Sequence, residues 1–142
     1  MNRMLAGIDV GRKNIVVGVV LFLFLGVVVG VLLTVNLFGG SLLTGSQYQT
    51  WKVLHGYGIF VAFVNFFFGY CIDRQNLNGW QKEIASWSFL FAGIVGSFGR
   101  PGLYLLSMDG GVYSYSVSFI ETVGFVLGTF IFLYQQVKER PA

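Results

Sequence analysis

The sequence has little charge: only 11% of its 142 residues are Asp, Glu, Lys or Arg, against about 25% in soluble domains. A deficit of this size means that most of the surface meets lipid rather than water. Four spans of about 20 residues would leave only short loops in such a chain, which excludes a separate soluble domain. The net charge of +3 does not indicate nucleic-acid binding, because the basic residues lie at helix ends and not in a patch.

Cysteine and histidine are also scarce. The one cysteine, Cys71, excludes an internal disulfide. The one histidine, His55, excludes a multi-histidine metal site within one subunit, whereas a haem held by a single His is compatible with it. The usual motifs of soluble enzymes do not occur: there is no dinucleotide-binding glycine motif after a strand, no P-loop and no H-E-x-x-H pair.

Long apolar runs are what the sequence has in abundance. Their lengths of about 22 residues suit helices that cross a bilayer, whereas the strands of a membrane barrel would alternate in polarity. The runs cover residues 15–38, 51–72, 84–106 and 115–137, with a break at residues 99–102 in the third run. We therefore predict an all-α fold, in which residues 1–142 form a single transmembrane domain built as an integral membrane four-helix bundle.

The basic residues predict how this bundle is oriented. Most of them lie on one side of the predicted spans: Arg3, Arg12, Lys13, Arg74, Lys82, Lys138 and Arg140. Cytoplasmic loops of membrane proteins carry an excess of Lys and Arg. This side, together with the N- and C-termini, is therefore predicted to be cytoplasmic.

Polar side chains within the predicted spans are functional candidates, because burying them in hydrocarbon is costly. They are His55, Asn65, Arg100, Tyr104 and Glu121. At a rise of 1.5 Å per residue, His55 and Tyr104 lie within about 6 Å of the outer helix ends, and Arg100 and Glu121 lie about 9 Å deep. Asn65 lies about 21 Å deep and is therefore not expected to belong to the same group as these residues. We therefore predict that three helices send polar groups to one level in the outer half of the bilayer.

Simpler interpretations of these residues stay open. Arg100 and Glu121 would also form an ordinary interhelical ion pair, and His55 and Tyr104 would also serve as interfacial residues. Small residues on the helix faces allow helices, or a flat ligand, to approach closely. Two G-x-x-x-G pairs are of this kind, Gly26 with Gly30 and Gly124 with Gly128.

Short motifs follow one another in a specific order. N-L-F-G-G at 36–40 ends the first predicted helix, and W-K-V-L-H-G at 51–56 opens the second. G-L-Y-L-L-S at 102–107 closes the third, and a Tyr-Gln pair at 134–135 lies near the end of the fourth. In this order, over residues 18–138, the chain resembles the styrene oxide isomerase family, small bacterial inner-membrane enzymes of four helices.

The resemblance implies haem b bound in the membrane, near the subunit interfaces of a homotrimer. It implies that His55, in the motif opened by Trp51, is the axial ligand of the iron and that Tyr104 lines the substrate pocket. Ferric iron would act as a Lewis acid on the oxygen of a small apolar epoxide, and a hydride shift would then give an aldehyde. On this hypothesis Trp51 and Arg100 help to bind the haem, and Arg100 contacts either a haem propionate or an oxygen of the substrate. Glu121 would be catalytic, by stabilising developing positive charge or by orienting Arg100.

The sequence departs from the family pattern at two positions. Val61 stands where the family has an asparagine six residues after the histidine, and Gly96 where it has an aspartate eight residues before the tyrosine. These departures leave open a divergent relative that keeps the haem site but has changed its substrate or lost isomerase activity. Two other functions also stay open: a haem-binding protein for gas sensing or electron transfer, and a small proton-coupled transporter that uses Glu121. The predicted partners are the lipid bilayer, a small apolar substrate and further copies of the chain, with no nucleic acid.

Overall fold

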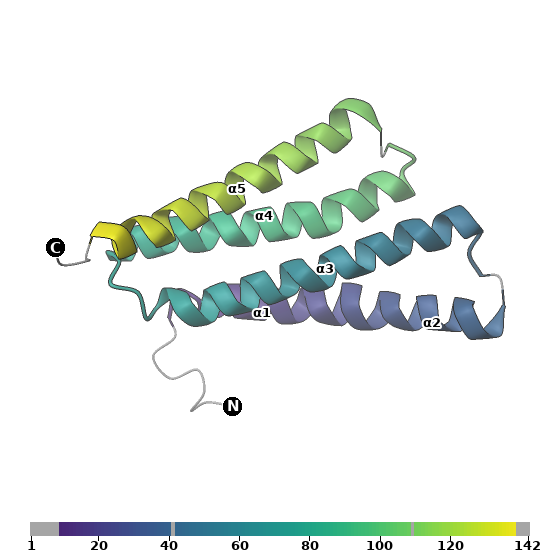
Figure 1. The fold of residues 1–142 in the computed structure, drawn as a ribbon, viewed down its shortest axis with the longest axis horizontal. Helices are drawn as coiled ribbons and strands as arrows, with labels where there is room; N and C mark the ends of the chain where they lie inside the picture. The colour runs from purple at the N-terminus through teal and green to yellow at the C-terminus, as the bar shows by residue number, and fades with distance from the viewer. Residues whose placement is uncertain (1–8, 41, 109, 139–142) are drawn as a thin grey trace.

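Four long helices make up the described part of the chain, arranged as two antiparallel hairpins (Figure 1). The computed structural model describes residues 9–40, 42–108 and 110–138, apart from the side chains of residues 135, 136 and 138. The helices are α1 (Arg12–Leu21) continued by the π-helical stretch η1 (Phe22–Val28) and α2 (Val29–Gly39), then α3 (Gly45–Ile72), α4 (Gly79–Leu105) and α5 (Gly111–Lys138). The predicted all-α fold is confirmed for these described residues.

The helices α3 and α4 begin well before the apolar runs that predicted them, at Gly45 instead of 51 and at Gly79 instead of 84. Thr44 caps α3 by accepting a hydrogen bond from the backbone N–H of Gln47, whose side chain accepts one from the backbone N–H of Thr44. Asn78 and Gln81 form the same capping box before α4. Capping residues are polar, so a count of apolar residues does not include them.

Three of the four helices are long and apolar enough to cross a membrane: Arg12–Gly39, Gly45–Ile72 and Gly111–Tyr134. α4 has a similar length of 27 residues but is not among them. It carries Lys82 and Glu83 in its first turns and Arg100 near its end, which lower its mean hydropathy. The polar helix of the bundle is therefore the one packed between two apolar neighbours, α3 and α5.

The hairpins are held together by close helix contacts. α1 packs on α3, α4 packs on α5, and α3 against α4 joins the two hairpins. Phe68 of α3 stacks on Phe89 of α4 with ring centroids 3.9 Å apart. A Cβ atom added at Gly18 would lie 2.7 Å from the carbonyl oxygen of Ala62, so α1 and α3 approach each other through a residue without a side chain.

One end of the bundle contains the start of α1, the end of α3, the start of α4 and the end of α5 (Figure 1). We call it the termini end, and the other the opposite end. The described basic residues that predicted the cytoplasmic side gather here: Arg12, Lys13, Arg74 and Lys82. Arg3 and Arg140, which contributed to the same prediction, lie outside the described residues.

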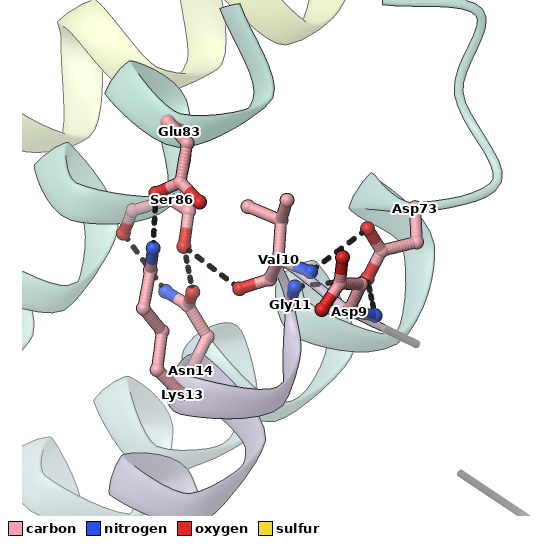
Figure 2. A network of polar contacts seen from close by, with 8 residues as sticks. All are labelled: Asp9, Val10, Gly11, Lys13, Asn14, Asp73, Glu83 and Ser86. Atoms are coloured by element: carbon pink, nitrogen blue, oxygen red, sulfur yellow. Dashed lines mark hydrogen bonds and ion pairs between the residues drawn. The ribbon is translucent and has the colours of Figure 1, made fainter. Parts of the chain in front are cut away.

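A polar network ties the helices together at the termini end (Figure 2). The Asp73 carboxylate accepts hydrogen bonds from the backbone N–H groups of Asp9, Val10 and Gly11, at 2.8 to 3.1 Å. A side chain from the end of α3 thus caps the start of α1, where unpaired N–H groups attract a carboxylate. Lys13 and Glu83 form an ion pair between α1 and α4.

Asn65 belongs to this network and not to the opposite end. Its side-chain oxygen accepts a hydrogen bond from Asn14, and its amide donates to the carbonyl of Val61. Asn14 also donates to the carbonyl oxygen of Ser86 and accepts from the Ser86 hydroxyl. Asn14, Asn65 and Ser86 are each 0% exposed. Asn65, which the sequence places deeper than the other candidates, thus has its side-chain partners in this network.

Candidate functional site

His55 lies on α3 and faces the first helix. Its Nδ1 is 2.7 Å from the backbone carbonyl oxygen of Leu25, which belongs to the π-helical stretch η1. The imidazole ring lies against Gly30, where an added Cβ would be 3.0 Å from Cε1 of His55. The second glycine of the first G-x-x-x-G pair therefore makes room for the histidine ring.

The partner of Nδ1 decides what the other ring nitrogen can do. A carbonyl oxygen can only accept, so Nδ1 is the nitrogen that carries the proton and donates to Leu25. In the neutral ring Nε2 then keeps its lone pair, and no hydrogen bond to it occurs within the described part of the chain. Histidines that bind metals usually have this arrangement, in which a backbone carbonyl fixes the tautomer of the ligand.

The local structure of the first helix favours this contact. Residues Phe22–Val28 are π-helical, and π-helical turns inside α-helices are often found at functional sites. The Leu25 side chain is 1% exposed and packs in a core cluster with Leu21 and Val61. This packing fixes the backbone at Leu25, and with it the carbonyl oxygen that meets His55.

Trp51 and Tyr104 meet at the opposite end. Their rings are 6.1 Å apart between centroids and lie edge to face, at 89°. Trp51 precedes His55 by one helical turn on α3, so both side chains lie on one side of that helix. The contact thus places the end of α4, which carries Tyr104, one turn above the histidine.

Arg100 and Glu121 form an ion pair between α4 and α5. Nη2 of Arg100 donates to Oε2 of Glu121 at 2.6 Å, and their side chains are 34% and 7% exposed. The guanidinium also lies over the ring of Tyr57 from α3, 5.1 Å from its centroid. The ion pair left open by the sequence is therefore present, and it includes an aromatic partner that sequence reasoning missed.

Gly96 provides the space for this pair. A Cβ atom added there would lie 2.5 Å from Oε1 of Glu121 and 2.8 Å from Oη of Tyr57. Both distances are too short for a real contact, so any side chain at this position would displace its neighbours. A carboxylate from α5 thus fills the place that a side chain of residue 96 would take.

The predicted site residues therefore form a row rather than a single cluster. Glu121 contacts Arg100, which lies one turn from Tyr104, and Tyr104 contacts Trp51, which lies one turn from His55. Among the contacts of the described residues, none joins His55 directly to Arg100 or Glu121.

Sequence reasoning missed three features of this row: Tyr57, the carbonyl of Leu25 and the contact of Gly30 with the imidazole. The G-x-x-x-G pair was the one available signal for the last of these. Comparisons of the chain with protein families, curated proteins and solved structures find no match.

Proposed function

We propose that this chain is an integral membrane protein that binds haem b through His55 and isomerises a small apolar epoxide to an aldehyde. The hydrogen bond between Nδ1 of His55 and the Leu25 carbonyl carries the proposal. It leaves Nε2 as a neutral, oriented electron-pair donor, which is what an axial ligand of haem iron requires. The residues present therefore fit a haem held by one histidine.

The proposal places all four helices across a bacterial inner membrane. α4 crosses as the polar helix that its neighbours shield, because intramembrane charges are tolerated where they face the bundle. The basic residues at the termini end put that end, with both termini, in the cytoplasm. His55, Arg100 and Glu121 then lie towards the outer face. The homotrimer is part of the proposal through the family resemblance.

A ferric haem, when bound, supplies a Lewis acid that polarises the epoxide oxygen. The protein supplies the surroundings. The row of site residues begins at Trp51 and Tyr104, whose hydroxyl can donate a hydrogen bond to a substrate oxygen. Apolar helix faces exclude water, which would otherwise trap a ring-opened cation.

Glu121 is the residue that we assign to stabilising developing positive charge. The resembled family has an aspartate where this chain has Gly96, and Oε1 of Glu121 lies 2.5 Å from the place of a Cβ atom at that position. The carboxylate is thus supplied by α5 instead of α4. Arg100 orients it through the bond at 2.6 Å; contact of Arg100 with a haem propionate stays a prediction.

Absorption spectra of protein purified in mild detergent test the haem site. We expect a Soret band that is lost in His55→Ala. Gly30→Ala should shift or weaken the band, because its Cβ would press on the imidazole ring. Gly56→Ala is the matched control, since nothing lies within 4 Å of a Cβ at that position. Protein without a Soret band, or an unchanged spectrum in His55→Ala, would refute the proposal.

Turnover of styrene oxide tests the reaction separately. We expect phenylacetaldehyde from the wild-type protein and a large loss of product in Glu121→Gln. The double variant Gly96→Asp with Glu121→Gly returns the carboxylate to α4 and should recover part of the activity. A Soret band with CO binding and no turnover would instead favour a haem-binding sensor. Substrate-dependent proton movement in haem-free protein, lost in Glu121→Gln, would favour the transporter.

A further inference from the structure

An apolar groove lies between the first helix and α3, in the half of the bundle nearer the termini end. Its residues are Gly18, Val19 and Phe22 of the first helix and Ala62, Phe63 and Phe66 of α3. The groove has a volume of about 200 Å³. A cavity of about 150 Å³ with similar walls holds a benzene molecule. The groove is therefore large enough for a segment of a hydrocarbon chain.

The shape of the groove is set by close packing of the two helices. A Cβ atom added at Gly18 would lie 3.2 Å from Cβ of Phe66, so the helix backbones approach each other beneath the groove. Phe22 and Phe63 meet edge to face with ring centroids 6.0 Å apart, at the end of the groove farther from the termini. The side of the groove away from the bundle is open, since Val19 is 43% exposed. In a bilayer this open side meets lipid.

Two arginines continue the walls of the groove towards the termini end. Arg12 precedes Val19 by seven residues, which is two helical turns, so both lie on one face of the first helix. Tyr70 follows Phe63 by the same seven residues on α3. The Arg74 guanidinium lies over the Tyr70 ring, 3.8 Å from its centroid, and donates a hydrogen bond to the Tyr70 carbonyl. Both walls thus lead from apolar side chains to a guanidinium group.

The two arginines lie at one level and have no paired carboxylate. Asp73, the neighbour of Arg74, uses its side chain to cap the backbone just before Arg12. On the side of the first helix that faces α4, Lys13 is neutralised by Glu83. No ion pair joins Arg12 or Arg74 to an acidic side chain within the described part of the chain. The groove therefore leads to a positively charged site.

We propose that the groove binds one acyl chain of an anionic phospholipid of the cytoplasmic leaflet, whose phosphate is held by Arg12 and Arg74. Guanidinium groups bind phosphate oxygens through pairs of parallel hydrogen bonds. Long basic side chains near helix ends reach the membrane surface, and basic pockets between helices on the cytoplasmic side bind lipid head groups. The site rests on the membrane placement proposed above, but it requires neither haem nor His55.

Native mass spectrometry of the full chain in mild detergent measures the binding of single lipids. The probes are phosphatidylglycerol and phosphatidylcholine with identical acyl chains. We expect the wild type to bind phosphatidylglycerol about tenfold more tightly, and Arg12→Gln and Arg74→Gln each to weaken this binding about fivefold. Lys52→Gln is the matched control, because it removes one charge at the opposite end of α3, and it should change nothing.

Substitutions in the groove test the acyl chain separately from the head group. Val19→Trp fills the groove and should weaken the binding of both lipids about tenfold, because the chain loses its apolar contacts. Val20→Trp is the matched control. Val20 is similarly exposed, at 50%, but does not line the groove, so the same enlargement there should leave lipid binding unchanged.

Three results would overturn the proposal: equal binding of the two lipids by the wild type, equal losses in the arginine variants and Lys52→Gln, or equal losses in Val19→Trp and Val20→Trp. Break-up of an oligomer in Val19→Trp, with no lipid bound to the wild type, would assign the groove to a second copy of the chain and overturn it too. His55→Ala should bind phosphatidylglycerol as the wild type does. Failure of the haem site and failure of the lipid site are therefore separate results.

Discussion

The two ends of the bundle treat buried polar groups in opposite ways. At the termini end Asn14, Asn65 and Ser86 are fully buried, and each has hydrogen-bond partners from a neighbouring helix. At the opposite end Arg100 and Glu121 pair with each other, while Oη of Tyr57 and Nε of Arg100 are buried without a hydrogen-bond partner among the described residues.

The difference separates a network whose polar groups are paired from one whose polar groups are paired only in part. A fully paired network in a dry interior strengthens and orients the helices that share it. Unpaired polar atoms lower stability, so the polar groups of the two ends differ in what they contribute to the stability of the fold. Burial alone would not have distinguished the two ends, since both contain polar side chains that water barely reaches.

Removing Arg100 should have the largest effect on stability. Glu121 is 5% exposed, and Arg100→Ala would leave its carboxylate buried without a cation. We expect a loss of about 3–5 kcal/mol in the free energy of unfolding, measured by denaturant titration in detergent. The exposed Arg74→Ala is the control, with an expected change of about 0.5 kcal/mol. Equal effects of the two substitutions would mean that the ion pair contributes nothing.

Asn14→Leu should come next, since it takes one hydrogen bond away from each of three polar groups at the termini end. The side-chain oxygen of Asn65 and the hydroxyl and carbonyl of Ser86 all lose a hydrogen bond. We expect a loss of about 2–3 kcal/mol by the same titration. Ser97→Ala removes a buried hydroxyl from the opposite end and should cost nothing. Similar losses in both variants would abolish the distinction between the ends.

Gly96→Ala tests the packing on which the opposite end depends. The new methyl group would lie 2.5 Å from Oε1 of Glu121, so the α4–α5 contact must shift. We expect the free energy of unfolding to fall by about 1–3 kcal/mol, as measured by thermal unfolding. Gly102→Ala on the same helix has nothing within 4 Å of its Cβ and should be neutral or stabilising. A neutral Gly96→Ala would show that Glu121 is free to move away.

Asp73→Ala should have the smallest effect. It removes the acceptor of three backbone N–H groups before α1, and loss of a helix cap costs about 1 kcal/mol. Amide hydrogen exchange at Val10 and Gly11 should accelerate. Asp73→Asn keeps one side-chain carbonyl acceptor, so its exchange rates should lie between those of the wild type and Asp73→Ala. Unchanged exchange in Asp73→Ala would show that the start of α1 does not depend on this cap.

Much of the fold could be predicted from the sequence, because long apolar runs of this kind are compatible with few structures other than long helices. The helix starts could not, since Thr44 and Asn78 act through side-chain to backbone bonds that hydropathy does not record. α4 also shows the limit of hydropathy. It is as long as its neighbours, yet it carries the charge of Arg100 and falls outside the helices that composition alone marks as spans.

The candidate site was predictable where side chains share a depth. Arg100 and Glu121 were predicted at one level, and they form an ion pair. Tyr57 was not found, because it lies two residues after His55 and therefore on a different face of α3. That face is turned towards α4, which carries Arg100, and not towards the first helix. The partner of His55 was not found either, since it is a backbone carbonyl, which every residue possesses.

The π-helical stretch Phe22–Val28 has a consequence for the whole first helix. One residue more or fewer in a helix turns everything beyond it by about 100°. η1 therefore sets the rotational phase between Asn14, which serves the termini end, and Gly30, which faces His55. A single-residue deletion in this stretch would leave each half helical but let only one half face its partner. The contacts at both ends of the molecule thus depend on the rotation of α2 relative to α1 that η1 sets.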